Sequence, residues 1–180
     1  MNKILLLSLA AGAGSVVWAQ TNSVAPQPSQ QEIGLHSDHF LFDGSARQLV
    51  YSDHVRATNA QGKLTCERLT IYLPPEGSVS TRPTNAVAET NVVIDFVDKG
   101  DTNHLTCDKA IYDYNVVNGL TNETFTFTGH ATNTSSKAWI TGEPLVWDNV
   151  RGRFSGANFE SHFKQPGGSG GGTNAAPFKF

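Results

Sequence analysis

Residues 105–113 read LTCDKAIYD, and the same degenerate phrase occurs three more times in the chain. The other copies begin at residues 35 (LHSDHFLFD), 64 (LTCERLTIY) and 140 (ITGEPLVWD). Each copy has an aliphatic first residue, a small third, an acidic fourth, and apolar sixth and eighth residues. The copies begin 29, 41 and 35 residues apart. Repeats at such intervals indicate stacked supersecondary units that bury their apolar faces against one another. Such a protein typically functions through a long surface or groove.

Within each copy, the parity of the apolar residues changes halfway along. In the second copy, Leu64 and Cys66 alternate with polar residues, whereas Leu69 and Ile71 alternate on the opposite parity. Because successive side chains point to opposite faces of a strand, this change requires a bulge or corner. β-branched and aromatic residues dominate the ordered segments, and few segments have a helical period. We therefore expect an all-β fold of repeated antiparallel strand pairs that fold over at a corner.

The composition argues against nucleic-acid binding and catalysis. Charged residues make up 16% of the 180 residues, and the formal net charge is −3. A chain with this charge has no broad electrostatic attraction for nucleic acid. The sequence contains no CxxC motif, no phosphate-binding glycine loop and no nucleophile elbow. His36 and His39 flank Asp38, but their odd spacing places them on opposite faces of a strand. We expect no enzyme, cofactor or catalytic metal, with a metal site at His36 and Asp38 as the minor alternative.

The first 19 residues are typical of a secretory signal peptide. Lys3 precedes an apolar run from Ile4 to Val17, and Val17-Trp18-Ala19 fits a small-x-small cleavage site. The run is shorter than the roughly 20 residues needed to span a bilayer. We expect cleavage after Ala19 and secretion, with a retained membrane anchor as the alternative.

Composition divides the rest of the chain into three segments. Ser, Pro and Gln are abundant in the first, and Gly in the last, which is typical of flexible segments. The expected segments are a disordered lead-in at 20–32, one β domain at 33–164 and a flexible Gly-rich tail at 165–180.

A second pattern, a Gly/Ser-x-x-Val strand followed by a turn, lies between the copies. It occurs as Ser52-Asp53-His54-Val55, Thr90-Asn91-Val92-Val93 and Gly129-His130-Ala131. Together with the four copies, it resembles the periplasmic lipopolysaccharide-transport bridge family, the OstA-like or LptA-like proteins. The resemblance covers roughly residues 33–163 and implies a bent, V-shaped antiparallel β-jellyroll with an apolar interior open at its ends. Cys66, Cys107 and Pro144 depart from the family pattern.

The resemblance also implies a function, a location and partners. Such a domain shields the acyl chains of lipopolysaccharide in the periplasm, between the inner and outer membranes, and a paralogue would bind a similar amphiphile. It joins copies of itself, or related jellyroll proteins, through edge strands. Because open sheet edges are templates for pairing, we expect contact edges near Phe40 and Phe159. The alternative is that the lead-in and tail cap these edges and keep the chain monomeric.

The alternating apolar residues supply the groove that the resemblance implies. Each methylene exposed to water costs about 0.8 kcal/mol, and an antiparallel sheet can be apolar on one face while the other is solvated. The residues expected to face inward and bind acyl chains are Leu64, Leu69, Ile71, Leu105, Tyr112, Phe125, Phe127, Ile140, Leu145 and Trp147. The alternative interpretation is that these side chains fill an ordinary closed core and contact no ligand.

Cys66 and Cys107 are the third residues of the second and third copies. Equivalent positions on alternate antiparallel strands lie about 9–10 Å apart, too far for a disulfide. If one copy is instead a full coil, the positions stack about 4.8 Å apart, and an oxidising compartment then permits a disulfide. A Cys66–Cys107 disulfide and two buried free thiols therefore stay open as alternatives.

Two other classes of protein also stay open. A secreted structural β-repeat protein would use the repeats only to build a stiff rod with a filled interior. A jelly-roll carbohydrate-binding domain would present an aromatic platform, with Trp139, Trp147 and Tyr114 coplanar on one face.

Overall fold

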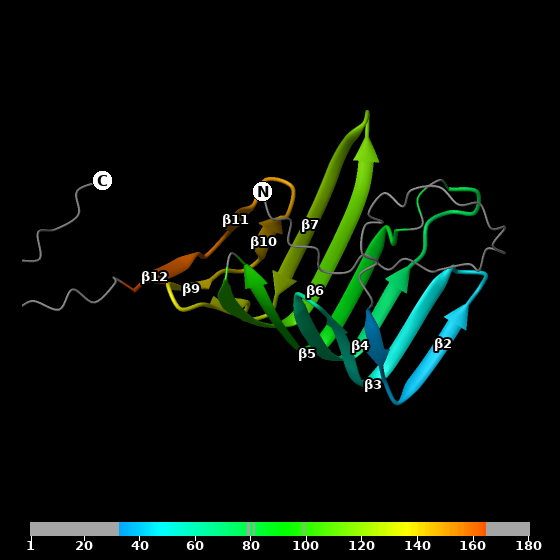
Figure 1. Cartoon of the computed structure of the whole chain (residues 1–180), viewed down its shortest axis with the longest axis horizontal. Coiled ribbons are helices and arrows are strands. Elements are labelled where there is room, and N and C mark those ends of the chain that lie inside the picture. Colours follow the sequence, from blue (N-terminus) through cyan, green and yellow to red (C-terminus); the bar gives the residue numbers. More distant parts are fainter. Residues whose placement is uncertain (1–32, 79, 81, 99, 165–180) are drawn as a thin grey trace, which may run out of the picture.

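Figure 1 shows the computed structural model, which describes residues 33–78, 80, 82–98 and 100–164. The twelve strands of this part form one antiparallel sheet, and no helix occurs among these residues. The described residues thus include no helix that could cross a membrane. The expected all-β fold is confirmed. The predicted signal peptide, lead-in and Gly-rich tail lie outside the described residues.

The strands differ greatly in length, and the longest four, β3 to β6, are consecutive. The strands are β1 (Gly34–His36), β2 (His39–Asp43), β3 (Gln48–Asn59), β4 (Gly62–Tyr72), β5 (Asn85–Asp98), β6 (Asp101–Val117), β7 (Leu120–Thr128), β8 (Thr132–Thr134), β9 (Ala138–Thr141), β10 (Leu145–Asp148), β11 (Arg153–Gly156) and β12 (Glu160–Phe163).

Each of the four long strands changes its pairing at one common level. Register shifts separate two paired halves in β3–β4, β4–β5 and β5–β6. At the same level β6 changes partner, pairing with β8 through residues 104–106 and with β7 through residues 109–117. The sheet therefore divides into two leaves joined by β3 to β6, which agrees with the expected bent jellyroll.

The leaves differ in the short strands that extend them. Leaf A has the order β2-β3-β4-β5-β6-β7-β10-β11, and leaf B has the order β1-β3-β4-β5-β6-β8-β9-β12. Both leaves share β3 to β6 at their centre and are extended by further strands beyond β3 and beyond β6. Each leaf therefore has two terminal strands that pair on one side only. These edges are β2 and β11 in leaf A, and β1 and β12 in leaf B.

Bulges of one kind produce the corners. Asp53 and His54 together oppose the single residue Glu67, and both have left-handed backbone, with φ of 64° and 52°. The same arrangement places Thr90 and Asn91, with φ of 66° and 53°, opposite Asp108. Two residues opposing one is the geometry of a β-bulge, which bends the strand and increases its twist. The bulges thus lie within the second sequence pattern, opposite the corner predicted inside each copy.

The acidic fourth residues of the copies line this bend. Asp38 accepts a hydrogen bond from His54 Nδ1 over 2.7 Å, and Asp108 lies 3.4 Å from His130 Nδ1. The hydrogen bond with His54 lowers the pKa of Asp38 and raises the pKa of His54. Glu143 accepts a hydrogen bond from the backbone N–H of Gly129 over 2.8 Å. Two of these carboxylates therefore pair with histidine side chains of the corners, and a third satisfies a corner backbone N–H.

The copies also align across the sheet. Their first residues, Leu35, Leu64, Leu105 and Ile140, share one cross-strand row of leaf B. Their sixth residues, Phe40, Leu69, Ala110 and Leu145, share a row of leaf A. Their eighth residues, Phe42, Ile71, Tyr112 and Trp147, share the next row of leaf A. The repeat therefore encodes the apolar rows of both leaves.

Gly129 provides a test of the corner. Its φ is 73°, and a β-carbon there would clash with the Asp108 carboxylate. Gly119 has a similar φ of 75°, but a β-carbon there would meet no atom within 4 Å beyond its own chain neighbours. We expect Gly119→Ala to lower the free energy of unfolding by about 1 kcal/mol and Gly129→Ala by about 3 kcal/mol. Urea denaturation measures both values, and equal losses would show that the corner is not tightly packed.

Candidate functional site: the interior between the leaves

All ten residues predicted to face inward belong to one apolar core or pack against it. Eight of them are buried: Leu64, Leu69, Ile71, Leu105, Tyr112, Phe125, Phe127 and Leu145. Ile140 and Trp147 are half-buried and pack against this cluster. The inward orientation of the set therefore agrees with the structure, whereas its contact with a lipid stays a prediction.

The interior contains narrow apolar pockets rather than an open channel. One pocket, about 30 Å³ in volume, lies where Ala86, Ala88 and Ala110 of leaf A meet Leu64 and Ile94 of leaf B. The three alanines interrupt rows of larger side chains, so they leave a trough in leaf A. A volume of about 10–15 Å³ holds one water molecule. This trough therefore has room for one or two water-sized molecules.

A second pocket of about 20 Å³ continues the interior toward β10 and β11. It is lined by Ile94, Phe96, Leu105, Phe125, Phe127, Trp147 and Phe154. The Trp147 and Phe154 rings pack with centroids 4.4 Å apart, and those of Phe125 and Phe127 are 6.4 Å apart. The aromatic contacts thus fill this part of the interior more completely than the alanines fill the trough.

At β2 the interior rows run onto an exposed edge. Phe40 pairs with Tyr51 and Phe42 with Leu49, which are half-buried residues of the inner face of leaf A. Phe40, Leu41 and Phe42 are nevertheless 58%, 59% and 56% exposed. At the other side of the molecule, Phe159 and Phe163 are exposed beside or within β12. The predicted edges near Phe40 and Phe159 therefore coincide with terminal strands or their immediate flank.

A buried ion pair closes the interior beyond Tyr112. Arg82 pairs with Glu123, and their side chains are only 21% and 6% exposed. The guanidinium carbon of Arg82 lies 4.4 Å from the centroid of the Tyr114 ring, and Tyr112 Oη donates a hydrogen bond to Glu123 over 3.3 Å. Burial, together with the Glu123 charge, raises the pKa of Tyr112. Removing one partner of such a pair leaves an uncompensated buried charge, which is strongly destabilising.

Sequence reasoning missed this ion pair. Glu123 has the same parity as Phe125 and Phe127 in β7, and this parity signals an inward carboxylate. Its partner comes from the connection between β4 and β5, 41 residues earlier in the chain. No local pattern indicates that contact.

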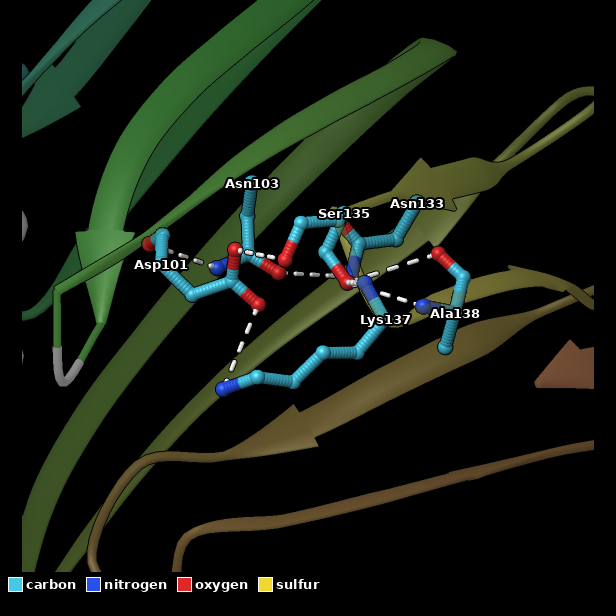
Figure 2. Close-up of polar contacts among 7 residues, drawn as sticks. Asp101, Asn103, Asn133, Ser135, Lys137 and Ala138 are labelled. Carbon is cyan, nitrogen blue, oxygen red and sulfur yellow. Dashed lines mark hydrogen bonds and ion pairs between the residues drawn. The ribbon is translucent and has the colours of Figure 1, made fainter. Parts of the chain in front are cut away.

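Within leaf B, a polar network joins the β8–β9 hairpin to the start of β6 (Figure 2). Asn133 is buried in the row between Leu105 and Ile140, and its side-chain amide donates to Asn103 Oδ1 over 3.2 Å. Ser136 Oγ donates to Asp101 over 2.7 Å, and this bond lowers the pKa of Asp101. Lys137 Nζ lies 3.7 Å from the same carboxylate. The network places a polar side chain between two apolar residues of this row.

Cys66 and Cys107 are buried free thiols, so the suggested disulfide does not form in this structure. Cys66 lies in β4 and Cys107 in β6, with β5 between them. Two strand spacings separate the positions by about 9–10 Å, beyond the reach of a disulfide. Burial raises the pKa of Cys66 to about 11 and that of Cys107 to about 12.

The described residues offer no metal site and no aromatic platform. They contain no group of three or more His, Cys, Asp or Glu side chains that could hold a metal ion. Trp147 packs on Phe154 in leaf A, Trp139 lies beside His162 in leaf B, and Tyr114 lies under Arg82. These three rings therefore do not share one face, as a carbohydrate-binding platform would require.

The thiols give a direct test of this packing. We expect a disulfide-exchange reagent such as DTNB to modify neither cysteine of the native protein at neutral pH, because burial keeps both thiols protonated and inaccessible. In denaturant without reductant, the same reagent should modify both. Full protection that persists in denaturant would instead indicate a disulfide.

Comparison with known proteins gives a similarity in structure and none in sequence. No protein-family model matches the sequence, and no curated protein matches it. The structure is similar to LptH from Pseudomonas aeruginosa, described as the LptA-homologous periplasmic component of the conserved lipopolysaccharide transport device. The similarity has a TM-score of 0.59 at 16% identity and covers 76% of this chain and 96% of LptH. The chain therefore has the LptA-like β-jellyroll fold.

Proposed function

We propose that this protein is a periplasmic lipid-shielding module of the lipopolysaccharide-transport bridge family. It binds the acyl chains of lipopolysaccharide, or of a similar amphiphile, between leaves A and B. The observation that carries this proposal is the continuity of the apolar rows, which run from the trough to the exposed side chains of β2. The fold that the chain shares with LptH supports it.

The energetics favour such a site over aqueous transfer. Each methylene moved from water into an apolar environment contributes about 0.8 kcal/mol, so an acyl chain gains several kcal/mol from a sheltered path. The trough, at about 30 Å³, is too small for an acyl chain in the conformation described. Binding therefore requires the leaves to separate, and the alanines mark the place where the least packing is lost.

Edge-strand pairing would join several molecules into a bridge. The edges β1 and β2 lie at one side of the sheet and β11 and β12 at the other, and none of them contains lysine, a residue that commonly protects exposed edges. A contact between the two different sides is head-to-tail. Such a contact yields a filament when its rotation does not close.

A structural β-repeat protein is the second candidate function. The small volume of both interior pockets favours it, because a stiff rod needs a filled interior. The two candidates differ in whether the trough accepts a ligand.

Substitution of Ala110 tests lipid binding in the trough. We expect native mass spectrometry of the secreted chain with lipopolysaccharide to show a lipid adduct, and Ala110→Leu to reduce the adduct about tenfold because its larger side chain fills the trough. Ala131→Leu is the matched control, since Ala131 is buried but lines neither interior pocket. Leu105→Glu should also remove the adduct. Folded wild-type protein without an adduct, for lipopolysaccharide and simpler amphiphiles alike, would favour the structural rod.

Substitution of Leu41 tests the bridge. Leu41 lies on the exposed edge strand β2, with the parity opposite to that of Phe40 and Phe42. We expect the wild-type chain to form concentration-dependent oligomers in sedimentation velocity and Leu41→Lys to remain monomeric while keeping its lipid adduct. Val97→Lys, at an exposed position on the internal strand β5, should assemble as the wild type does. A wild-type chain that is monomeric at all concentrations would overturn the assembly.

A further inference from the structure

The β6–β7 hairpin extends beyond its neighbours in leaf A, as Figure 1 shows. The pairing of β5 with β6 ends at Asn85 and Asp113, and that of β10 with β7 ends at Asp148 and Thr124. β6 and β7 nevertheless stay paired as far as Val117 and Leu120. Beyond those ends, two further backbone hydrogen bonds, at Tyr114 and Glu123, are the only ones that join the hairpin to its neighbours among the described residues. Residues 115–122 therefore form a free two-stranded ribbon.

The end of this ribbon is apolar on both faces. Val116, Val117 and Leu120 are 54%, 54% and 71% exposed. Val117 pairs with Leu120 on one face, while Val116 points to the opposite face because successive side chains alternate. Asn118 and Gly119 form the two-residue turn, with φ of 52° and 75°. No residue from 115 to 122 carries a charge.

These features fit immersion in hydrocarbon better than docking on a protein. A protein groove that covers one face of the ribbon leaves the other face in water, and a stable protein interface takes about 800 Å² from each partner. Three aliphatic side chains at the end of a narrow ribbon offer much less than that. Strand pairing already satisfies the backbone groups next to the turn, so few unpaired polar groups enter an apolar medium.

A polar band lies directly behind the apolar end. Asn122 donates a side-chain hydrogen bond to Asn115 across the ribbon over 3.0 Å, and the exposed Thr121, opposite Val116, borders this pair. Neutral amide and hydroxyl groups suit the headgroup region of a bilayer, whereas the apolar side chains suit its acyl boundary. Between the Asn118–Gly119 turn and the Asn115–Asn122 pair, the ribbon thus has an apolar level followed by a polar one, as the acyl boundary is followed by the headgroups at a lipid surface.

We propose that the end of the β6–β7 hairpin is a membrane-contact site that inserts Val116, Val117 and Leu120 into the surface of a phospholipid bilayer. This site is separate from the trough and holds the protein to a lipid surface rather than carrying a lipid. Because the site has no charge, the contact does not depend on anionic headgroups.

Vesicle flotation tests the proposal independently of lipopolysaccharide. The secreted chain, with its processed N-terminus verified, is mixed with vesicles of phosphatidylcholine and phosphatidylethanolamine and centrifuged through a density gradient. We expect the wild-type chain to float. In the triple variant Val116→Thr, Val117→Thr and Leu120→Thr, the ratio of vesicle-bound to free protein should fall about tenfold. Threonine retains a high strand propensity, which preserves the hairpin. Raising the salt concentration should leave the binding unchanged.

Two controls locate the contact. Val97→Thr and Val150→Thr remove exposed apolar groups elsewhere on the molecule and should float as the wild type does. Ala110→Leu should also float normally, because the trough takes no part, so loss of lipopolysaccharide binding and loss of membrane contact are distinguishable. A wild-type chain that does not float, or flotation that depends on Leu41 and not on the hairpin, would overturn the proposal.

A fluorescence measurement does not require the triple variant to fold. Leu120→Trp places an indole at the end of the hairpin, where vesicles should shift its emission to shorter wavelength and brominated lipids should quench it. Val97→Trp is the matched control and should show neither change. Equal quenching of the two variants would contradict insertion of the hairpin.

Discussion

The alternation of side chains across a bent strand is the constraint on which this structure depends. β3 to β6 belong to both leaves, so each must present apolar residues to the same interior on either side of the bend. In β4 the inward residues change from Leu64 and Cys66 to Leu69 and Ile71, which shifts the parity by one residue. In β3 the parity is unchanged, because two left-handed residues are inserted at the corner. At the corner, two residues of β3 oppose one residue of β4. This difference allows the neighbouring strands to bend together.

This constraint explains how much of the fold could be predicted. The parity change inside each copy is local, so the sequence is enough to predict the corner and the inward residues on both sides of it. The change of partner by β6, from β8 to β7, depends on where the chain returns after the corner at Gly129 and His130. No periodic pattern in the sequence predicts this change of partner. The break of the first copy into two strands, β1 and β2, is equally hidden, because the first copy reads like those that form the continuous strands β4 and β6.

The interior shows the same division between local and long-range information. Eight of the ten residues of the proposed groove could be predicted because they recur at fixed positions in the copies, and Phe125 and Phe127 because they alternate with polar residues in a return strand. The trough could not, because it arises from Ala86 and Ala88 in a return strand lying beside Ala110 in a copy. The Arg82–Glu123 pair was also missed, since it joins a connecting segment to a distant strand. Features that combine different parts of the chain require the register, which only the structure supplies.

The sharing of strands between the leaves has a mechanical consequence. Across β3 to β6, one continuous backbone links leaf A to leaf B, so separating the leaves there means deforming covalent chain at every corner. Outside these strands, β1 and β2 on one side and β9, β10, β11 and β12 on the other belong to one leaf each. There the chain passes between the leaves through short connections, residues 37–38, 142–144 and 157–159, and not through a continuous paired strand. The molecule is therefore stiffest at its centre and most compliant at its two rims. An elongated guest would enter from a rim and advance inward by progressively wedging the leaves apart, against a resistance that rises toward the middle.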